Sequence, residues 1–280
     1  MNLINIRTFL KIFETGSLVR ASEALNVSQS TVTTRLHSLE SELGQILVSR
    51  QRPNAELTAA GFRFKRHAEL MINIWRLAKI ETSLPAHIDS VFNFGCHLDL
   101  WPELGRKLVD HVYCGSPKTA LSIWQGEQEE LDKWLGNGLI DVALAYQPVV
   151  HQNQTAQCIC SEKLVLYSTR LGSPMRFDPL YVYVHAGEDF ARNHAAAYAD
   201  ADTARVNFAS AVWAMEHLLE NGGSAYLPQR LAKSRVARGQ LHVVADAPVF
   251  ARNVYLVTNS ASAAGWPELL DLAKQLAQES

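Results

Sequence analysis

The stretch "NVSQSTVTTRLHSLESELG", residues 26–44, combines two features that one helix seldom carries together. Its apolar residues recur at spacings of four, three and four, which predicts a helix with one face packed against a core. They are Val32, Leu36, Leu39 and Leu43. The first turns instead carry a run of short polar side chains: Ser28, Gln29, Ser30, Thr31, Thr33 and Thr34. A helix needs one such residue as its N-cap, and Ser28 suits that place, so capping leaves five unexplained.

The flanking segments complete a small domain. An amphipathic helix is expected before Gly16, and a second, short one over residues 18–25 with Ser17 as its cap. Residues 46–58 are expected to form two short extended pieces around Arg50 and Arg52, a hairpin by their turn residues. Three helices and a basic hairpin predict a winged helix-turn-helix over residues 1–58.

The polar start of the third helix suits the major groove of DNA, which admits one helix and meets the side chains of its N-terminal turns. Gln29 can pair with adenine, the Thr31 methyl group can contact thymine, and Arg35 can reach guanine or a phosphate. Arg50 and Arg52 suit a neighbouring phosphate or the minor groove. The candidate DNA-binding residues are Ser28, Gln29, Ser30, Thr31, Thr33, Thr34, Arg35, Arg50 and Arg52. A merely solvated helix face would leave the polar run and the basic hairpin unexplained.

Charge is distributed unevenly along the chain. Nine Lys and Arg against five Glu give residues 1–66 a net charge of +4, whereas the remaining residues hold 17 basic and 23 acidic side chains, a net −6. A basic N-terminal module on an acidic body favours a nucleic-acid partner for the module.

The composition also indicates in which cellular compartment the protein is expected. Four cysteines in 280 residues indicate a reducing environment rather than a disulfide scaffold. The N-terminal stretch lacks the pattern of a signal peptide, and no apolar run approaches the roughly 18 residues of a membrane span. A cytoplasmic protein is expected.

Residues 58–84 form one long helical pattern with a regular apolar stripe. The stripe consists of Phe64, Ala68, Met71, Trp75 and Ala78. This apolar stripe lies on a helix that follows the complete N-terminal domain, so it must be buried against another surface. We expect that surface to be a second copy of the chain; the alternative is that the helix packs on the rest of its own chain. Pro85 ends this helix, so residues 59–86 are predicted to be a linker and dimerisation helix with its hinge.

Beyond the hinge, strands alternate with helices. Strands are expected at 91–96, 119–124 and 141–146, with helices at 100–112 and 126–136 between them. A second set follows, up to a strand at 253–258 and a helix at 266–277. Apolar strands alternating with helices predict a sheet buried on both faces. Residues 87–280 are therefore expected to form an α/β domain of two lobes with a cleft between them: lobe I about 90–160 plus 260–280, and lobe II about 161–259.

A family resemblance agrees with these expectations. "FLKIFETGSLVRASEALNVSQSTVTTRLHSLESELG" (9–44), Arg50 and "LTAAG" (57–61) resemble the N-terminal signature of the LysR-type transcriptional regulators. Ser22, Val48 and Thr33 depart from it where Ala, Phe and Ser are common. Residues 92–95, 141–146 and 221–228 are similar to parts of the family's effector domain.

The resemblance implies an α+β winged helix-turn-helix, a long linker helix and a two-lobed periplasmic-binding-protein-like α/β domain that binds a small effector. It also implies homodimers, often tetramers, on double-stranded promoter DNA. "INIWRLAK" (72–79) and "LDLWPEL" (98–104) resemble a subgroup that includes repressors of flagellar master operons.

Ligands of open α/β sheets lie at strand ends, which defines the candidate effector site. Its residues are Cys96, His97, Leu98, Asp99, Tyr146, Gln147, His185, Phe208 and Ser210. Each alone is more often structural, but together they are expected to line a pocket. Asp99 is expected to cap the helix that begins near Leu100 and to occupy amides that a carboxylate ligand would use. We therefore expect a neutral or cationic effector, unless Asp99 is a cap turned away from the cleft.

Other chemistry finds little support. Cys158 and Cys160 would face one side of a strand, but neither has a basic neighbour to activate it, and with His151 their spacing is irregular for zinc. Neither a G-x-S-x-G nor an H-E-x-x-H motif occurs. No metal, cofactor or enzymatic activity is expected. The sequence predicts a DNA-binding regulator modulated by an unknown small molecule, or a DNA-binding regulator without an effector whose cleft has collapsed.

Overall fold

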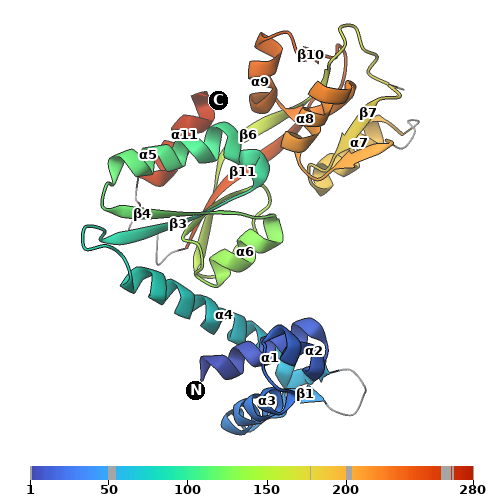
Figure 1. Cartoon of the computed structure of the whole chain (residues 1–280). Helices are drawn as coiled ribbons and strands as arrows, with labels where there is room; N and C mark the ends of the chain where they lie inside the picture. The colour runs from blue at the N-terminus through green and yellow to red at the C-terminus, as the bar shows by residue number, and fades with distance from the viewer. Residues whose placement is uncertain are drawn as a thin grey trace. The chain divides into compact units, whose positions relative to one another are not determined.

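A computed structural model describes residues 2–49, 55–176, 178–199, 204–259, 266 and 268–279. The chain divides into two compact units, Met1–Pro85 and Ala86–Ser280 (Figure 1). Each unit has its own apolar core. Within the described ranges, no helix is both long and apolar enough to cross a membrane.

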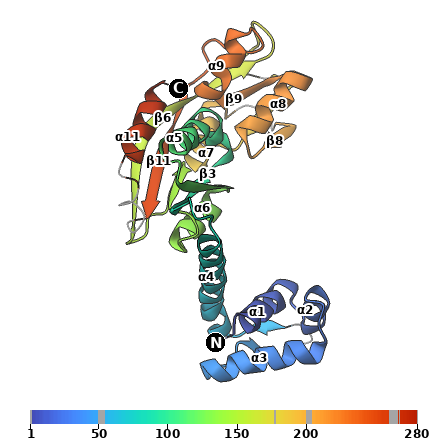
Figure 2. The same ribbon diagram turned by 60° about the vertical axis from the view of Figure 1, so that its left-hand side comes forward.

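The N-terminal unit holds helices α1 (Leu3–Thr15), α2 (Leu18–Ala24) and α3 (Gln29–Leu43), then a two-stranded wing of β1 (Val48–Ser49) and β2 (Glu56–Leu57), then α4 (Ala59–Thr82). The wing strands pair antiparallel. In Figure 2, α3 runs along one edge of the unit with α1 and α2 on one side of it. The tip of the expected hairpin, with Arg50 and Arg52, lies outside the described residues.

Local signals determine where these helices begin and end. The Ser17 hydroxyl accepts a hydrogen bond from the amide of Arg20, and Gly16 ends α1 in the left-handed region with φ 65°. Gly61 is required for a different reason, because a Cβ there would lie 2.1 Å from the Leu47 carbonyl oxygen. This close approach lets the start of α4 pack directly on the segment that leads into the wing.

The stripe on α4 serves two surfaces. Phe64, Ala68 and Met71 pack against the core of the N-terminal unit itself. Trp75, one turn further along, keeps 47% of its surface exposed, and its neighbours Ile74 and Ile80 are also exposed. The first half of the stripe therefore covers the chain's own three-helix core, which is the alternative to pairing with a second copy, and pairing between copies stays a prediction.

The C-terminal unit is built on one sheet, whose strand order within the described residues is β4-β3-β5-β11-β6-β9-β7-β8, with β10 paired to β6. Three parallel strands form one end: β3 (Ser90–Cys96), β4 (Thr119–Gln125) and β5 (Val142–Ala145). The other end contains β7 (Tyr181–Val184), β8 (Val206–Phe208) and β9 (Ser224–Pro228). The long strands β6 (Gln154–Ser168) and β11 (Phe250–Asn259) pair antiparallel between the two ends, and β10 is His242–Val243.

Helices cover both ends of this sheet (Figure 1). Lobe I, the β3–β5 end, is covered by α5 (Arg106–Gly115) and α11 (Leu269–Glu279) on one face and by α6 (Gln128–Gly136) on the other. Lobe II, the β7–β9 end, carries α7 (Glu188–Ala197), α8 (Ala211–Asn221) and α9 (Gln229–Ala237). The sequence pattern missed the first half of β6, because exposed and buried residues alternate irregularly there and β6 bulges at Ile159, opposite Val254 and Tyr255 of β11.

The helix expected at 100–112 is wrong in its first half. A short 3-10 turn spans Leu98–Leu100, and α5 begins only at Arg106. Between them the chain leaves helical geometry, with Glu103 at φ 71°. Pro102 contributes because it cannot donate an amide hydrogen bond. The carbonyl oxygens of Asp99 and Pro102 instead accept hydrogen bonds from Arg230 of lobe II.

Candidate functional sites

The polar start of α3 has a capped and an outward-facing part. Ser28 is the N-cap and accepts the amide of Thr31 at 3.2 Å. Its hydroxyl also lies 2.8 Å from those of Ser30 and Thr31. Three of the six polar side chains therefore form one network of hydroxyl groups around the first turn.

The remaining polar residues face away from the core. Gln29 and Thr34 are exposed, and Thr33 and Arg35 are half-buried. Gln29 and Thr33 share a face because they are one helical turn apart. The opposite face buries Val32, Leu36 and Leu39, whereas Leu43, also expected in the core, is 41% exposed at the end of the helix.

The connection between α2 and α3 gives the helix-turn-helix its geometry. Asn26 adopts φ 51° in the turn, a conformation that asparagine tolerates better than most residues. The amide of Val27 then donates to the carbonyl of Ser22. Two short helices joined by such a turn form the motif that presents its second helix to DNA.

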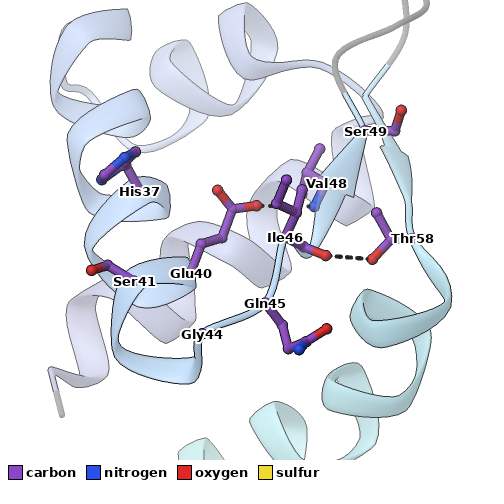
Figure 3. A pocket seen from close by; sticks show the side chains of 9 residues that line it. All are labelled: His37, Glu40, Ser41, Gly44, Gln45, Ile46, Val48, Ser49 and Thr58. Atoms are coloured by element: carbon purple, nitrogen blue, oxygen red, sulfur yellow. Dashed lines mark hydrogen bonds between the residues drawn. The ribbon is translucent and has the colours of Figure 1, made fainter.

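The other end of α3 forms a groove of about 880 Å³ with the wing (Figure 3). The Glu40 carboxylate accepts the amides of Leu47 and Val48 at 2.8 and 3.2 Å, and the Thr58 hydroxyl donates to the Ile46 carbonyl at 2.6 Å. These bonds tie the wing to α3 and to the start of α4. The groove is lined by His37, Glu40, Ser41, Gly44, Gln45, Ile46, Val48, Ser49 and Thr58. Sequence patterns did not indicate it.

A second candidate site lies where the lobes of the C-terminal unit meet. Asp99, in the turn after β3, is 1% exposed, and its Oδ1 accepts the Ser210 hydroxyl at 2.7 Å and the Val212 amide at 3.2 Å. Ser210 and Val212 belong to the N-terminal turn of α8 in lobe II. Asp99 therefore contacts a helix of the other lobe, and the expectation that it caps the helix following its own strand is wrong.

Arg230 of α9 also joins the lobes. Its guanidinium donates to the carbonyl oxygens of Asp99 and Pro102, the latter at 2.9 Å, and to the Tyr146 hydroxyl at 3.2 Å. It donates further to the Glu162 carboxylate at 3.0 Å. Its side chain is only 6% exposed, so its bonds to Glu162, Asp99 and Tyr146 are buried, and the bond to Pro102 is partly buried.

Glu162 on β6 forms ion pairs with two arginines, Arg230 and Arg252. Its other oxygen accepts Arg252 of β11 at 2.8 Å, and the Arg252 guanidinium lies 3.4 Å from the centre of the Tyr146 ring. Burial opposes the charged form of Arg230 and Arg252, yet Tyr146 and Glu162 together raise the pKa of both. Burial raises the pKa of Tyr146, which keeps this phenol protonated.

A pocket of about 210 Å³ adjoins this cluster. Its lining residues are His97, Glu127, Gln128, Tyr146, Gln147, His185, Ala186, Gly187, Ala209 and Arg252. The His97 Nε2 lies 3.1 Å from a Glu127 carboxylate oxygen, and this hydrogen bond lowers the pKa of Glu127. The ring of His97 meets that of Tyr146 edge-on at 5.0 Å.

The structure thus brings four of the nine expected effector-site residues to one pocket: His97, Tyr146, Gln147 and His185. It joins Asp99 and Ser210 to each other. The remaining three, Cys96, Leu98 and Phe208, are not in the pocket lining, and burial raises the pKa of the Cys96 thiol, which lies in the lobe I core.

Several functional residues escaped the sequence analysis. Glu127 and Gln128 follow the end of β4, so the strand-end argument applied to that strand would have found them. Glu162, Arg230 and Arg252 lie inside regular elements and carried no such signal. Among the described residues, no group of three His, Cys, Asp or Glu side chains is arranged to hold a metal ion.

Comparisons with known proteins concern the family and the fold of the chain. Residues 3–62 match the family model of the bacterial regulatory helix-turn-helix protein, lysR family. The transcriptional regulator HdfR of Salmonella typhimurium is 27% identical over 257 residues, which cover 90% of each chain.

Solved structures of similar fold span nearly the whole chain. Full-length CbnR complexed with its target DNA is 19% identical, with a TM-score of 0.69 over 98% of this chain and 100% of that one. Full-length LysG of Corynebacterium glutamicum, solved with bound arginine, is 20% identical, with a TM-score of 0.55 over 100% and 99% of the two chains. At these identities the likeness concerns the fold, a helix-turn-helix unit followed by a two-lobed α/β unit.

Proposed function

We propose that this chain is a LysR-type DNA-binding transcriptional regulator and that it contacts the base edges of its operator through the outward face of α3. That face presents Gln29, Thr33 and Thr34 beside Arg35. The observation that carries the proposal is the division of α3 into a buried apolar side and an exposed polar N-terminal side. Ser28, Ser30 and Thr31 are the first-turn hydroxyl groups of the same surface, suited to a phosphate or a base.

The wing arginines Arg50 and Arg52 are proposed to contact phosphates beside the groove that α3 occupies. Their support is the net charge of +4 on residues 1–66 and their place between the two wing strands. We assign residues 1–58 to DNA binding, 59–86 to the linker helix and 87–280 to the effector domain.

The test is footprinting of DNA upstream of the chain's own gene, with the promoter of the flagellar master operon as a second candidate from the subgroup resemblance. A protected site that disappears for Gln29→Ala supports the assignment of α3. Protection that is identical for both proteins would place another element in the groove.

The effector domain is proposed to bind a small neutral or cationic molecule in the pocket of His97, Glu127, Tyr146, Gln147 and His185. Three carboxylates and two guanidiniums lie around this pocket: Glu162 bonds to both Arg230 and Arg252, Glu127 pairs with His97, and Asp99 bonds to Ser210. An added anion would therefore meet an existing excess of negative charge in a partly dry site. The bound arginine of LysG, a relative in fold only, is a cationic molecule.

Thermal melting against matched amine and carboxylate metabolites tests this proposal, since a bound ligand raises stability by mass action. Amines that raise the melting temperature of the wild type, but not of Glu127→Gln, support it. A dicarboxylate that binds tightly in calorimetry, with no change for Asp99→Asn, would refute it. If no compound raises the melting temperature, the second candidate function is favoured, a regulator without an effector. Its support is the direct hydrogen bonding between the two lobes.

Assembly is proposed to use the second half of α4. Ile74, Trp75 and Ile80 are exposed there, and Ala78 belongs to the same apolar stripe. A second copy of the chain, with its own α4, would bury these side chains and give a homodimer, and pairs of dimers would give a tetramer on promoter DNA.

A further inference from the structure

The N-terminal turn of α8 has the geometry of a carboxylate-binding site, and we propose that the chain fills this site with its own Asp99. Asp99 then acts as a built-in ligand that holds the lobes together when no effector is present. This inference rests on the proposed role of residues 87–280 as the regulatory domain.

The geometry at α8 is that of a bound anion. Oδ1 of Asp99 accepts the backbone amide of Val212 at 3.2 Å and the hydroxyl of Ser210 at 2.7 Å. α8 spans 11 residues, and the amides of a first helical turn attract a carboxylate because they are unpaired within the helix and lie at its positive end.

Asp99 differs from an ordinary cap in where it comes from. A cap is supplied by the residue that precedes the helix, and here Ser210 already fills that place, accepting the amides of Val212 and Trp213 at 3.2 and 3.4 Å. Asp99 reaches the same turn from the other lobe, 111 positions away in the chain.

The same residue is held from a second side. Arg230 of lobe II donates to the backbone carbonyl of Asp99, so the side chain and the main chain of one lobe I residue both bond to lobe II. Oδ2 of Asp99 is buried and has no hydrogen-bond partner among the described residues. Leaving one carboxylate oxygen buried without a hydrogen bond costs free energy, and the hydrogen bonds of Oδ1 and of the backbone carbonyl offset that cost.

The consequence is competition between Asp99 and free carboxylates. A tethered group acts at an effective concentration in about the millimolar range, so small carboxylates at lower concentration cannot displace it. The wild-type domain is therefore insensitive to simple monocarboxylates, and removal of the Asp99 side chain leaves a site that accepts them.

The test uses the full chain without DNA and acetate as the probe, with chloride at equal ionic strength as the reference. The variants are Asp99→Ala and, as a matched loss of one exposed carboxylate on α5, Asp110→Ala. We expect Asp99→Ala to melt at a lower temperature and its amides at 211–213 to exchange hydrogen at least tenfold faster. Acetate should raise its melting temperature by several degrees and slow that exchange, and should leave the wild type and Asp110→Ala unchanged.

Two outcomes would overturn the inference: an equal response of all three proteins to acetate, or unchanged exchange at 211–213 in Asp99→Ala. If Asp99→Ala does not fold, Asp99→Asn keeps the volume and one acceptor, and faster exchange at 211–213 in this variant is the expected result. Equal exchange in Asp99→Asn and the wild type would refute a role for the charge. These measurements involve no DNA. The operator proposal can therefore fail while this inference holds, and this inference can fail while the operator proposal holds.

Discussion

The carboxylate of Asp99 lies 2.7 Å from the hydroxyl of Ser210, and the two residues stand on different lobes of the C-terminal unit. Both were expected at the cleft as ligand contacts because each follows a strand end. They are instead bonded to each other, and the pocket of about 210 Å³ nearby is lined by His97 and Tyr146 rather than by either of them.

Gln29→Ala and Thr33→Ala should each weaken specific operator binding by about 1–3 kcal/mol, because each removes a proposed base contact on the outward face of α3. Binding to unrelated DNA should change little. Titrations with operator and scrambled duplexes measure both, and Ser41→Ala, exposed at the other end of α3, is the matched control. An operator affinity equal to that of the wild type in both variants would contradict the assignment.

Arg52→Ala should weaken specific and non-specific binding together, since a phosphate contact carries no sequence information. The slope of log K against log salt should fall by about one for each lost contact. Measuring affinity at several salt concentrations gives this slope. A loss restricted to the operator, with an unchanged slope, would instead place Arg52 on a base.

Trp75→Glu and Met71→Glu should separate the two surfaces of α4. Trp75→Glu places a charge on the exposed half of the stripe, so sedimentation should show smaller species while the melting of the N-terminal unit is unchanged. Met71→Glu places a charge against the unit's own core and should destabilise it by several kcal/mol. If Trp75→Glu sediments like the wild type, α4 does not form the interface between two copies of the chain.

Arg230→Ala should destabilise the C-terminal unit by about 3–5 kcal/mol, because it leaves Glu162 and the carbonyl oxygens of Asp99 and Pro102 short of donors. Denaturant unfolding measures this loss. Arg238→Ala, at the exposed C-terminal cap of α9, controls for the loss of an arginine. Equal midpoints for the two variants would show that the interlobe bonds add no stability.

His194 should make the stability of lobe II depend on pH. Burial among Tyr181, Phe190 and Tyr198 lowers the pKa of this imidazole below its ordinary value of 6.5. Below pH 6.5 the unfolded chain therefore binds more protons than the folded one. Its contribution is complete above pH 6.5 and is lost as the pH falls from there through the folded pKa.

Melting temperatures between pH 5 and 8 test this dependence. His194→Gln should flatten the decline on the acid side, whereas His111→Gln, at an exposed position of α5, should not. A decline that is as steep in His194→Gln as in the wild type would assign the effect to another group.

The helix-turn-helix could be predicted from the linear chain alone. Spacing of Val32, Leu36 and Leu39 gave the buried face of α3, and the caps at Ser17 and Ser28 gave the starts of two helices. These features depend on neighbours within a few residues, so they can be recognised in the linear chain. The strand ends that hold His97, Tyr146 and His185 were recognisable for the same reason.

Contacts between residues far apart in the chain could not be predicted in this way and became visible in the folded structure. The two halves of the α4 stripe have the same spacing of apolar residues. Phe64 and Met71 nevertheless pack against the core of the N-terminal unit, whereas Trp75 stays exposed. The bond from Asp99 to α8 and the bonds from Arg230 to the carbonyls of Asp99 and Pro102 join segments more than 100 residues apart. Such contacts depend on how two lobes pack against each other, and no local pattern of residues encodes that packing.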